Sequence, residues 1–120
     1  MKSIKGYHIN AENRTVTEVE VKGDYKTIYP FLGESVDCFT CVGIEKDDTI
    51  YVDDEGLLKP LTALFLYEGY DQPLAGNGLI LGTDAEGESV SPANTLEFIK
   101  SKVKFMTPME ARLWAMEHDA

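Results

Sequence analysis

Apolar and polar residues alternate in two segments near the start of the chain, residues 4–9 and 15–21. The alternation is clearest over 16–21, where the order is Val-Thr-Glu-Val-Glu-Val. Residues 10–13, which separate the two segments, have the composition of a turn. A period of two with β-branched residues on both sides of a turn is typical of a β-hairpin. The chain is therefore predicted to begin with a hairpin.

A second hairpin is predicted in the middle of the chain. Residues 38–44 and 49–52 are rich in strand formers, and the polar residues 45–48 between them have turn chemistry. Further on, residues 79–81 form a short apolar run that fits a buried strand. The segment 57–67 is apolar enough to be buried, but its period does not separate strand from helix.

Between the two hairpins, the pattern predicts a short helix over residues 25–32. Asp24 is a suitable N-cap, and Ile28, Phe31 and Leu32 would face inward. Pro30 should make this helix irregular or end it early, because proline lacks a backbone N–H.

An amphipathic helix is predicted in the last third of the chain. Leu96, Ile99 and Val103 stand at i, i+3 and i+7 behind the potential caps Asn94 and Thr95. Lysines 100 and 104 fall on its polar side and in its last turn.

The final residues carry the strongest local signal. Thr107, Pro108 and Glu110 supply an N-cap, an N1 proline and an N3 glutamate in the order of a capping box. A helix from Pro108 to about Glu117 follows. Its stripe consists of Met109, Leu113 and Met116, flanked by Trp114. So short a helix is marginal in water, so the stripe is expected to pack on the domain or on a partner.

These elements define an α+β fold in one domain, residues 1–120. We expect a small, mostly antiparallel sheet built from hairpins, a short helix after the second strand, and two C-terminal helices. The length suits one domain, since two independent cores would each be too small. The apolar fraction of 43% is that of a packed globule.

Two compositional features point to the cytoplasm. There is no signal-peptide pattern at the N-terminus and no apolar run of the roughly 18 residues that a membrane span needs. The two cysteines, Cys38 and Cys41, are too few for a disulfide framework, which favours a reducing compartment.

The net charge of −10 is concentrated in the middle of the chain. Residues 27–97 contain fourteen acids and two bases, whereas the segments before and after each have one base in excess. Such a surface repels phosphate backbones, so direct binding of DNA or RNA is not expected. It suits a basic partner or imitates nucleic acid, or it only keeps the protein soluble.

The candidate partner-binding residues are the acids of the polar turns together with the C-terminal tryptophan. They are Asp47, Asp48, Asp53, Asp54, Glu55, Asp84, Glu86 and Trp114. An alternative hypothesis is a pocket for a nucleotide-like ligand, in which turn glycines let the backbone approach the ligand closely. Its candidate residues are Phe39, Tyr51, Gly76, Asn77 and Gly78.

No residue pattern indicates catalysis, a metal site or a cofactor. Cys38 and Cys41 have metal or redox spacing, but a zinc site needs four ligands and neither cysteine begins a helix. We expect one of the two thiols to be buried in packing. The acidic segments 53–56 and 84–88 do not match the order of a calcium loop. No nucleophile elbow or phosphate-binding glycine loop is present.

Three sequence segments resemble a family of small domains of unknown function carried by bacteriophages and mobile elements. They span residues 28–33, 51–58 and 73–84, the last reading Pro-Leu-Ala-Gly-Asn-Gly-Leu-Ile-Leu-Gly-Thr-Asp. The resemblance covers roughly residues 15–105, so the Pro108–Glu117 helix lies beyond it. It implies a compact accessory protein that acts on host machinery by binding, in the cytoplasm of the host cell.

Two functional hypotheses follow. The first is a non-catalytic binding module that modulates or inhibits a host protein through its acidic surface. The second is a protein that binds or sequesters a small nucleotide-like ligand, or a minor enzyme. A homodimer is compatible with both.

Overall fold

The computed structural model describes residues 3–22, 25–33, 38–54 and 63–118. The strands are β1 (Ile4–Asn10), β2 (Thr15–Val21), β3 (Phe39–Gly43), β4 (Asp48–Asp53), β5 (Leu64–Tyr67), β6 (Leu74–Ala75), β7 (Gly78–Thr83), β8 (Ser89–Val90) and β9 (Val103–Met106). The helices are η1 (Tyr25–Thr27), α1 (Tyr29–Leu32), η2 (Glu45–Asp47), α2 (Leu96–Lys102) and α3 (Pro108–His118). This is the expected α+β class with antiparallel pairing.

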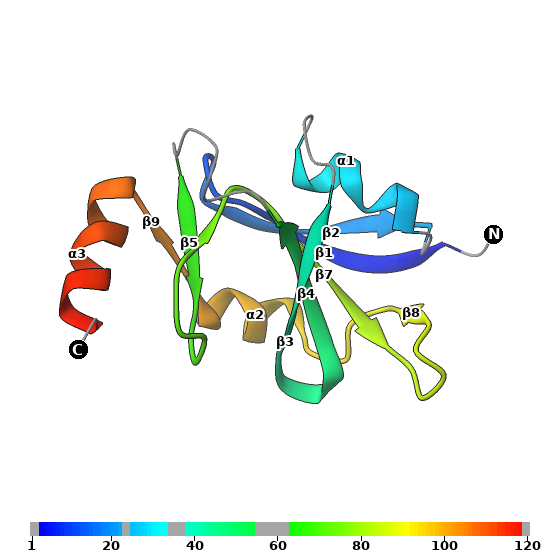
Figure 1. Cartoon of the computed structure of the whole chain (residues 1–120). Coiled ribbons are helices and arrows are strands. Elements are labelled where there is room, and N and C mark those ends of the chain that lie inside the picture. The colour runs from blue at the N-terminus through cyan, green and yellow to red at the C-terminus, as the bar shows by residue number, and fades with distance from the viewer. Residues whose placement is uncertain (1–2, 23–24, 34–37, 55–62, 119–120) are drawn as a thin grey trace.

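The strands form two sheets (Figure 1). The larger has the order β2-β1-β7-β4-β3, with β8 paired to β7, and the smaller has the order β6-β5-β9. Two sheets rather than one arise because β5, β6 and β9 pair among themselves. The central strand of the larger sheet is β7, which joins β1 on one side and β4 on the other.

Both predicted hairpins are confirmed. In the first, Ile4 pairs with Val21 and Asn10 with Thr15. The second pairs Phe39 with Asp53 and Gly43 with Thr49, so the polar residues 45–47 form its turn. Period-two alternation identified the strands of the first hairpin because one face of each lies in the core, and strand-forming residues around a polar turn identified the second.

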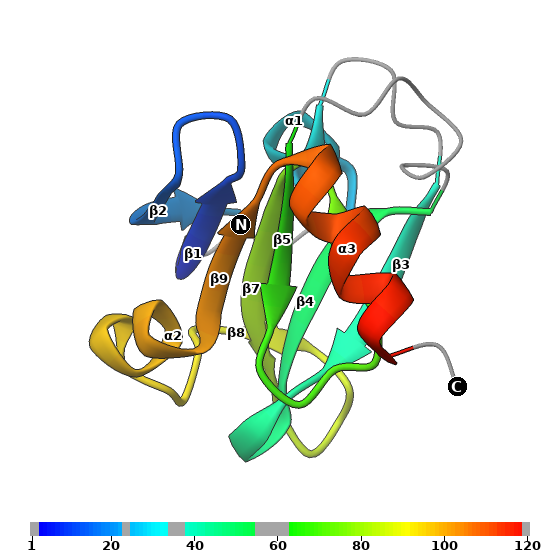
Figure 2. The same cartoon turned by 90° about the vertical axis from the view of Figure 1, so that its left-hand side faces the viewer.

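Side chains of the larger sheet enter two separate cores. One face packs against β5, β6 and α2 around buried residues that include Ile50, Phe65 and Ile80. The opposite face packs against α1, where Leu79 and Leu81 meet Ile28. Figure 2 shows the smaller sheet between α3 and the larger sheet. The layers therefore run α1, larger sheet, smaller sheet with α2, and α3.

The helix after β2 is shorter than predicted. Instead of one helix over residues 25–32, the chain forms a single 3-10 turn, η1, followed by the four-residue α1. Pro30 lies in the first turn of α1, as its fixed backbone angle favours. The expected inward residues Ile28 and Leu32 are buried.

The amphipathic helix near the C-terminus is confirmed over Leu96–Lys102, with Thr95 as the N-cap that accepts from the Phe98 N–H. It ends earlier than predicted. Val103 and Lys104 belong to β9, which pairs with β5 through Phe65 and Phe105. The helical spacing of Val103 was misleading. Residues 103–106 form a strand because they pair with β5, and β5 lies in segment 57–67, whose pattern did not separate strand from helix.

The capping box of α3 is confirmed in both directions. The Thr107 N–H donates to the Glu110 carboxylate at 3.0 Å, and the Glu110 N–H donates to the Thr107 hydroxyl at 3.1 Å. The inner side of α3 packs through Ala111 and Trp114 on a small core that contains Leu64 and Met106. Its predicted stripe does not pack on the domain: Met109, Leu113 and Met116 are 61%, 51% and 70% exposed.

None of the helices in the described ranges has both the length and the apolar content that a membrane crossing requires.

Candidate functional site

The predicted acidic residues divide between the two ends of β4. This strand has six residues, so its ends lie roughly 16 Å apart. Asp47 precedes β4, and Asp84 and Glu86 lie in the β7–β8 turn, which projects from the same side because Asp48 pairs with Gly82. Asp53 and Asp54 are at the other end. The sequence therefore predicted one surface where the structure has two.

The end with Asp47 is the more strongly charged, and we call it the acidic edge. It comprises Glu45, Asp47, Glu68, Asp84, Glu86 and Glu88. In Figure 1 its three contributing turns, β3–β4, β7–β8 and the turn after β5, all lie along the lower side.

The β3–β4 turn is held by a buried carboxylate. Asp48 is 1% exposed and accepts from the N–H groups of Ala93 at 2.8 Å and Asn94 at 2.9 Å. The Asn94 side-chain amide adds a third bond at 2.8 Å. Asp48 therefore lies inside the domain and does not contribute to the acidic surface as predicted. Its carboxylate instead fixes the start of β4 to the loop before α2.

Asn94 extends this contact to the turn and to the first strand. Its side-chain amide also donates to the Glu45 carbonyl at 2.7 Å, and its own carbonyl accepts from the Tyr7 hydroxyl at 2.8 Å. Tyr7 and Asn94 are 87 residues apart in the sequence, and both are buried. Every buried side-chain polar atom among the described residues has a partner, so this network is satisfied.

The turn itself has an uncommon backbone. Lys46 and Asp47 have φ values of 60° and 63°, in the left-handed region that residues other than glycine seldom adopt. The Ile44 N–H donates to the Asp48 carbonyl at 2.9 Å and closes the turn. With both ends fixed, the backbone of the turn holds Asp47 at its exposed tip.

In the β7–β8 turn, the Asp84 carboxylate accepts from the N–H groups of Glu86 and Glu88, both at 2.9 Å. Gly87, at φ 84°, supplies the left-handed residue that the turn requires. Asp84 thus shapes the turn, while the side chains of Glu86 and Glu88 remain exposed. A groove of about 480 Å³ separates this turn from Asp47, with Thr49 and Thr83 in its wall.

Glu45 and Glu68 share one lysine. The Lys102 ammonium lies 3.4 Å from Glu45 and 3.8 Å from Glu68. The Tyr67 hydroxyl also donates to Glu45 at 2.8 Å. A backbone hydrogen bond, then the bond from Tyr67, lowers the pKa of Glu45. Burial, followed by the bond to Glu45, raises the pKa of Tyr67. Glu45 is therefore held as a carboxylate and Tyr67 as a neutral phenol.

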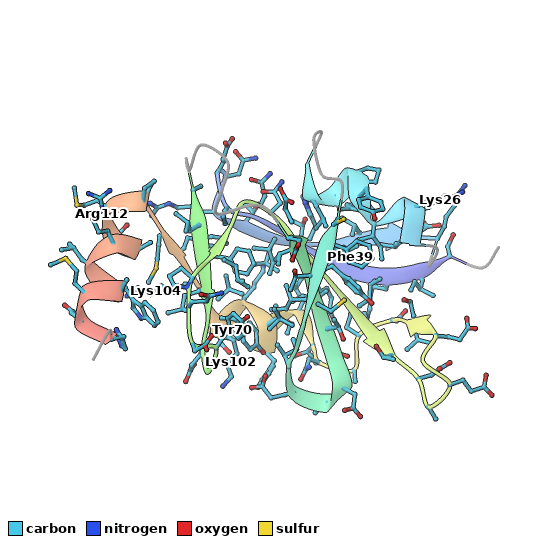
Figure 3. The ribbon with its side chains drawn as sticks, viewed as in Figure 1. Lys26, Phe39, Tyr70, Lys102, Lys104 and Arg112 are labelled. Atoms are coloured by element: carbon cyan, nitrogen blue, oxygen red, sulfur yellow. The ribbon has the colours of Figure 1, made fainter. Side chains whose placement is uncertain are left out.

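The remaining predicted partner-binding residues lie elsewhere. Asp54 accepts a hydrogen bond from Thr40, and Glu55 lies outside the described residues. Trp114 is on the inner side of α3, where it stacks on His118 with ring centroids 4.1 Å apart and lines a groove of about 540 Å³ with Pro73 and Arg112. Figure 3 places Arg112 at the α3 end and Lys102 near the acidic edge.

The residues of the alternative ligand pocket are not brought together. The ring centroids of Tyr51 and Phe39 are 5.1 Å apart, and both rings pack against the core between the larger sheet and α1. Gly78 faces the opposite side of the sheet, where an added Cβ would lie 3.0 Å from the Phe65 ring. The glycine is therefore explained by packing. Asn77 accepts from the Ala11 N–H at 3.3 Å, and Gly76 has a φ of 77°. These residues serve the turn geometry.

The expectation of one buried cysteine is wrong. Cys38 and Cys41 are both free and exposed. Partial burial still raises the pKa of the Cys41 thiol, which disfavours the reactive thiolate. No cluster of three potential metal-ligating side chains occurs within the described part of the chain.

Sequence reasoning missed three members of the acidic edge: Glu45, Glu68 and Glu88. Glu45 and Glu88 stand in segments that were identified as turns, so their exposure was a usable signal. Glu68 follows a strand that the ambiguous pattern did not reveal. The role of Asn94 as more than a helix cap had no local signal, because its partners are distant in the sequence.

In a comparison with protein families, the family described as a domain of unknown function, DUF3846, matches residues 4–104. The match ends before α3, as the resemblance from sequence had implied. No curated protein and no solved structure matches the chain.

Proposed function

This chain belongs to the DUF3846 family, and we propose that it is a non-catalytic binding module that binds a basic partner protein through the acidic edge. The observation that carries the proposal is the convergence of the β3–β4 and β7–β8 turns, both fixed by internal hydrogen bonds, with the side chains of Asp47, Glu86 and Glu88 exposed to solvent.

Charge on the edge is only partly balanced. Lys102 lies between Glu45 and Glu68, which leaves Asp47, Glu86 and Glu88 without a described ion pair. Exposed charges act over about 8 Å at physiological salt, so carboxylates on adjacent turns reinforce one another. Complementary charge speeds association with a basic partner and disfavours an acidic one. A nucleic acid is disfavoured for the same reason.

The fixed turns also favour affinity. A loop that must become ordered on binding loses conformational entropy, whereas a preorganised loop does not. Asp48 and Asn94 hold the β3–β4 turn from within the core, and Asp84 holds the β7–β8 turn. The backbone positions that carry the carboxylates are therefore fixed before a partner binds.

The electrostatics of the edge support binding rather than acid–base catalysis. A catalytic general acid needs a pKa raised toward neutrality. The pKa of Glu45 is lowered instead, mainly because its carboxylate accepts hydrogen bonds. An ionised carboxylate at neutral pH is suited to pairing with lysine or arginine.

The resemblance to phage-borne domains supports the finer part of the proposal. A small accessory protein of this type modulates or inhibits a host protein, and the interaction takes place in the host cytoplasm. The acidic edge supplies the surface that such a role requires.

Charge reversal on the edge tests the proposal. The variant Glu86→Lys/Glu88→Lys changes two exposed side chains of the β7–β8 turn. A matched control is Glu18→Lys/Glu20→Lys, because these exposed glutamates have the same spacing and lie on β2, away from the edge. Each immobilised protein is exposed to bacterial lysate at low salt and at about 150 mM salt, and the captured proteins are quantified by mass spectrometry.

We expect at least one basic protein to be retained by the wild type and the control, and to be reduced about tenfold or more on the edge variant. Retention should fall as salt rises. Thermal unfolding of all three proteins verifies that the substitutions leave the fold intact. If no captured protein distinguishes the edge variant from the control, the proposal fails.

A further inference from the structure

The outer face of α3 has no partner within the described residues. Large hydrophobic side chains are exposed on this face: Met109, Leu113 and Met116, at 61%, 51% and 70%. We propose that this face binds the same face of a second copy of the chain, with the two α3 helices parallel. This inference is independent of the acidic edge, whose turns lie along the lower side in Figure 1, whereas α3 lies at the left end.

The stripe has the spacing of a coiled-coil seam. Successive members are four and then three residues apart, which is the alternation of d and a positions in a heptad. Leu113 then occupies an a position, and the two methionines occupy d positions. The a and d side chains are exposed when the helix is alone, and they pack between the side chains of the facing helix when two helices associate.

The inner side of the helix is already occupied. Ala111 and Trp114 pack on the small core with Leu64 and Met106. At about 100° per residue, these positions lie nearly opposite the stripe. Each domain would therefore lie on the far side of its own helix, away from the stripe that meets the second copy.

Charges beside the stripe favour a parallel over an antiparallel pair. With Leu113 at a, Arg112 is at g, and Glu110 and Glu117 are at e. In a parallel pair, g of one helix faces e of the other, so Arg112 approaches Glu117 of the second copy twice by symmetry. An antiparallel pair would place like charges together. Neither Arg112 nor Glu117 has an ion pair among the described contacts.

The pair should be weak, because three side chains per copy form a seam well below the size of a standard interface. A dissociation constant on the order of 100 µM is expected. Sedimentation equilibrium of the full-length protein from about 5 to about 500 µM covers this range. Moderate salt is used, since each copy carries a net charge of −10.

Two sets of variants test the seam and its orientation. Leu113→Glu keeps a good helix former but places a charge in the seam, and we expect dimerisation to weaken at least tenfold. Arg112→Glu and Glu117→Arg should each weaken it about threefold to tenfold, and the double swap should restore it. Lys100→Glu, on the exposed side of α2, is the control for charge and should have no effect.

Cross-linking distinguishes the two orientations. In a Cys38→Ser/Cys41→Ser background, which removes the two native thiols, Met116→Cys should form a disulfide between copies on oxidation. A parallel pair brings the two copies of position 116 together, whereas an antiparallel pair separates them.

A chain that stays monomeric at about 500 µM overturns the proposal. So does a dimer that Leu113→Glu leaves unchanged, a double swap that fails to restore association, or a dimer without the 116 cross-link. Binding of α3 to anionic lipid vesicles by a protein that remains monomeric would also overturn it, because a membrane surface would then cover the stripe.

Discussion

The acidic edge and α3 present exposed side chains in different ways. The edge is fixed by hydrogen bonds between residues far apart in the sequence, such as Asp48 with Asn94 and Asn94 with Tyr7. The α3 helix is fixed by its own capping box and by a thin contact through Trp114. Only the first lies within the residues matched by the family. The difference indicates that the turns of the edge are part of the domain, whereas α3 is an addition to it.

Removing the buried carboxylate of Asp48 should have the largest effect on the free energy of unfolding. Asp48→Ala leaves the N–H groups of Ala93 and Asn94 without their acceptor inside the domain. Each unsatisfied buried group costs about 1–3 kcal/mol, so we expect a loss of about 3 kcal/mol or more in the free energy of unfolding. Urea denaturation measures it. A loss below about 1 kcal/mol would show that the network does not hold the edge.

Gly82→Ala should cause the next largest loss of stability. An added Cβ would lie 2.5 Å from the Ser91 carbonyl oxygen, so the loop leading to Asn94 would have to move. We expect a cost of about 2 kcal/mol. Gly43→Ala is the matched control, because its Cβ would meet nothing within 4 Å and its φ is not positive. Equal stability of the two variants would contradict the close approach of loop and sheet.

Within α3, the two sides should respond differently. Trp114→Ala removes contacts with the core at Leu64 and Met106, and we expect a loss of about 1–2 kcal/mol. Leu113→Ala changes an exposed residue and should alter monomer stability by less than about 0.5 kcal/mol. Thermal unfolding at a protein concentration too low for association makes this comparison. A larger effect at Leu113 would mean that the stripe packs on the domain.

The smallest effect should be a pH dependence at the edge. The folded state lowers the pKa of Glu45 below its ordinary value of 4.5, mainly through hydrogen bonds to the carboxylate. Its contribution to stability is therefore present above about pH 4.5 and is lost as the pH falls through the folded pKa. Glu45→Gln should lessen the loss of stability on acidification, measured by urea denaturation between pH 6 and 3. An unchanged acid dependence would remove Glu45 from the network.

Local patterns predicted the elements whose causes are local. The first hairpin followed from alternation over 16–21, the second from strand-forming residues on both sides of a polar turn, and α3 from the order of Thr107, Pro108 and Glu110. The strand β9 was missed because Val103 fits a helical stripe, and only pairing with β5 makes it a strand. Tertiary pairing outweighed a local pattern there, as it commonly does for short segments.

The candidate site was predictable only in part. Asp47 and Asp84 belong to recognisable turns, but the sequence does not show that pairing of β4 with β7 brings these turns together and separates Asp53 from them. Asp48, adjacent to Asp47, has the same local signal and yet is buried. The groups that donate hydrogen bonds to its carboxylate belong to residues 93 and 94. They are distant in the sequence, so no rule based on neighbouring residues identifies them.

The central place of β7 has a consequence for the order of folding. Ile80 pairs with Tyr7 on one side and with Ile50 on the other. During synthesis both hairpins emerge before β7. Until β7 is made, β1 and β4 each have one edge without a pairing strand. Closing such long loops is slow compared with forming a hairpin. We expect the two hairpins to form early and independently, and the joining of the sheet by β7 to limit the rate. Until that step the open edges of β1 and β4 are where a nascent chain would aggregate.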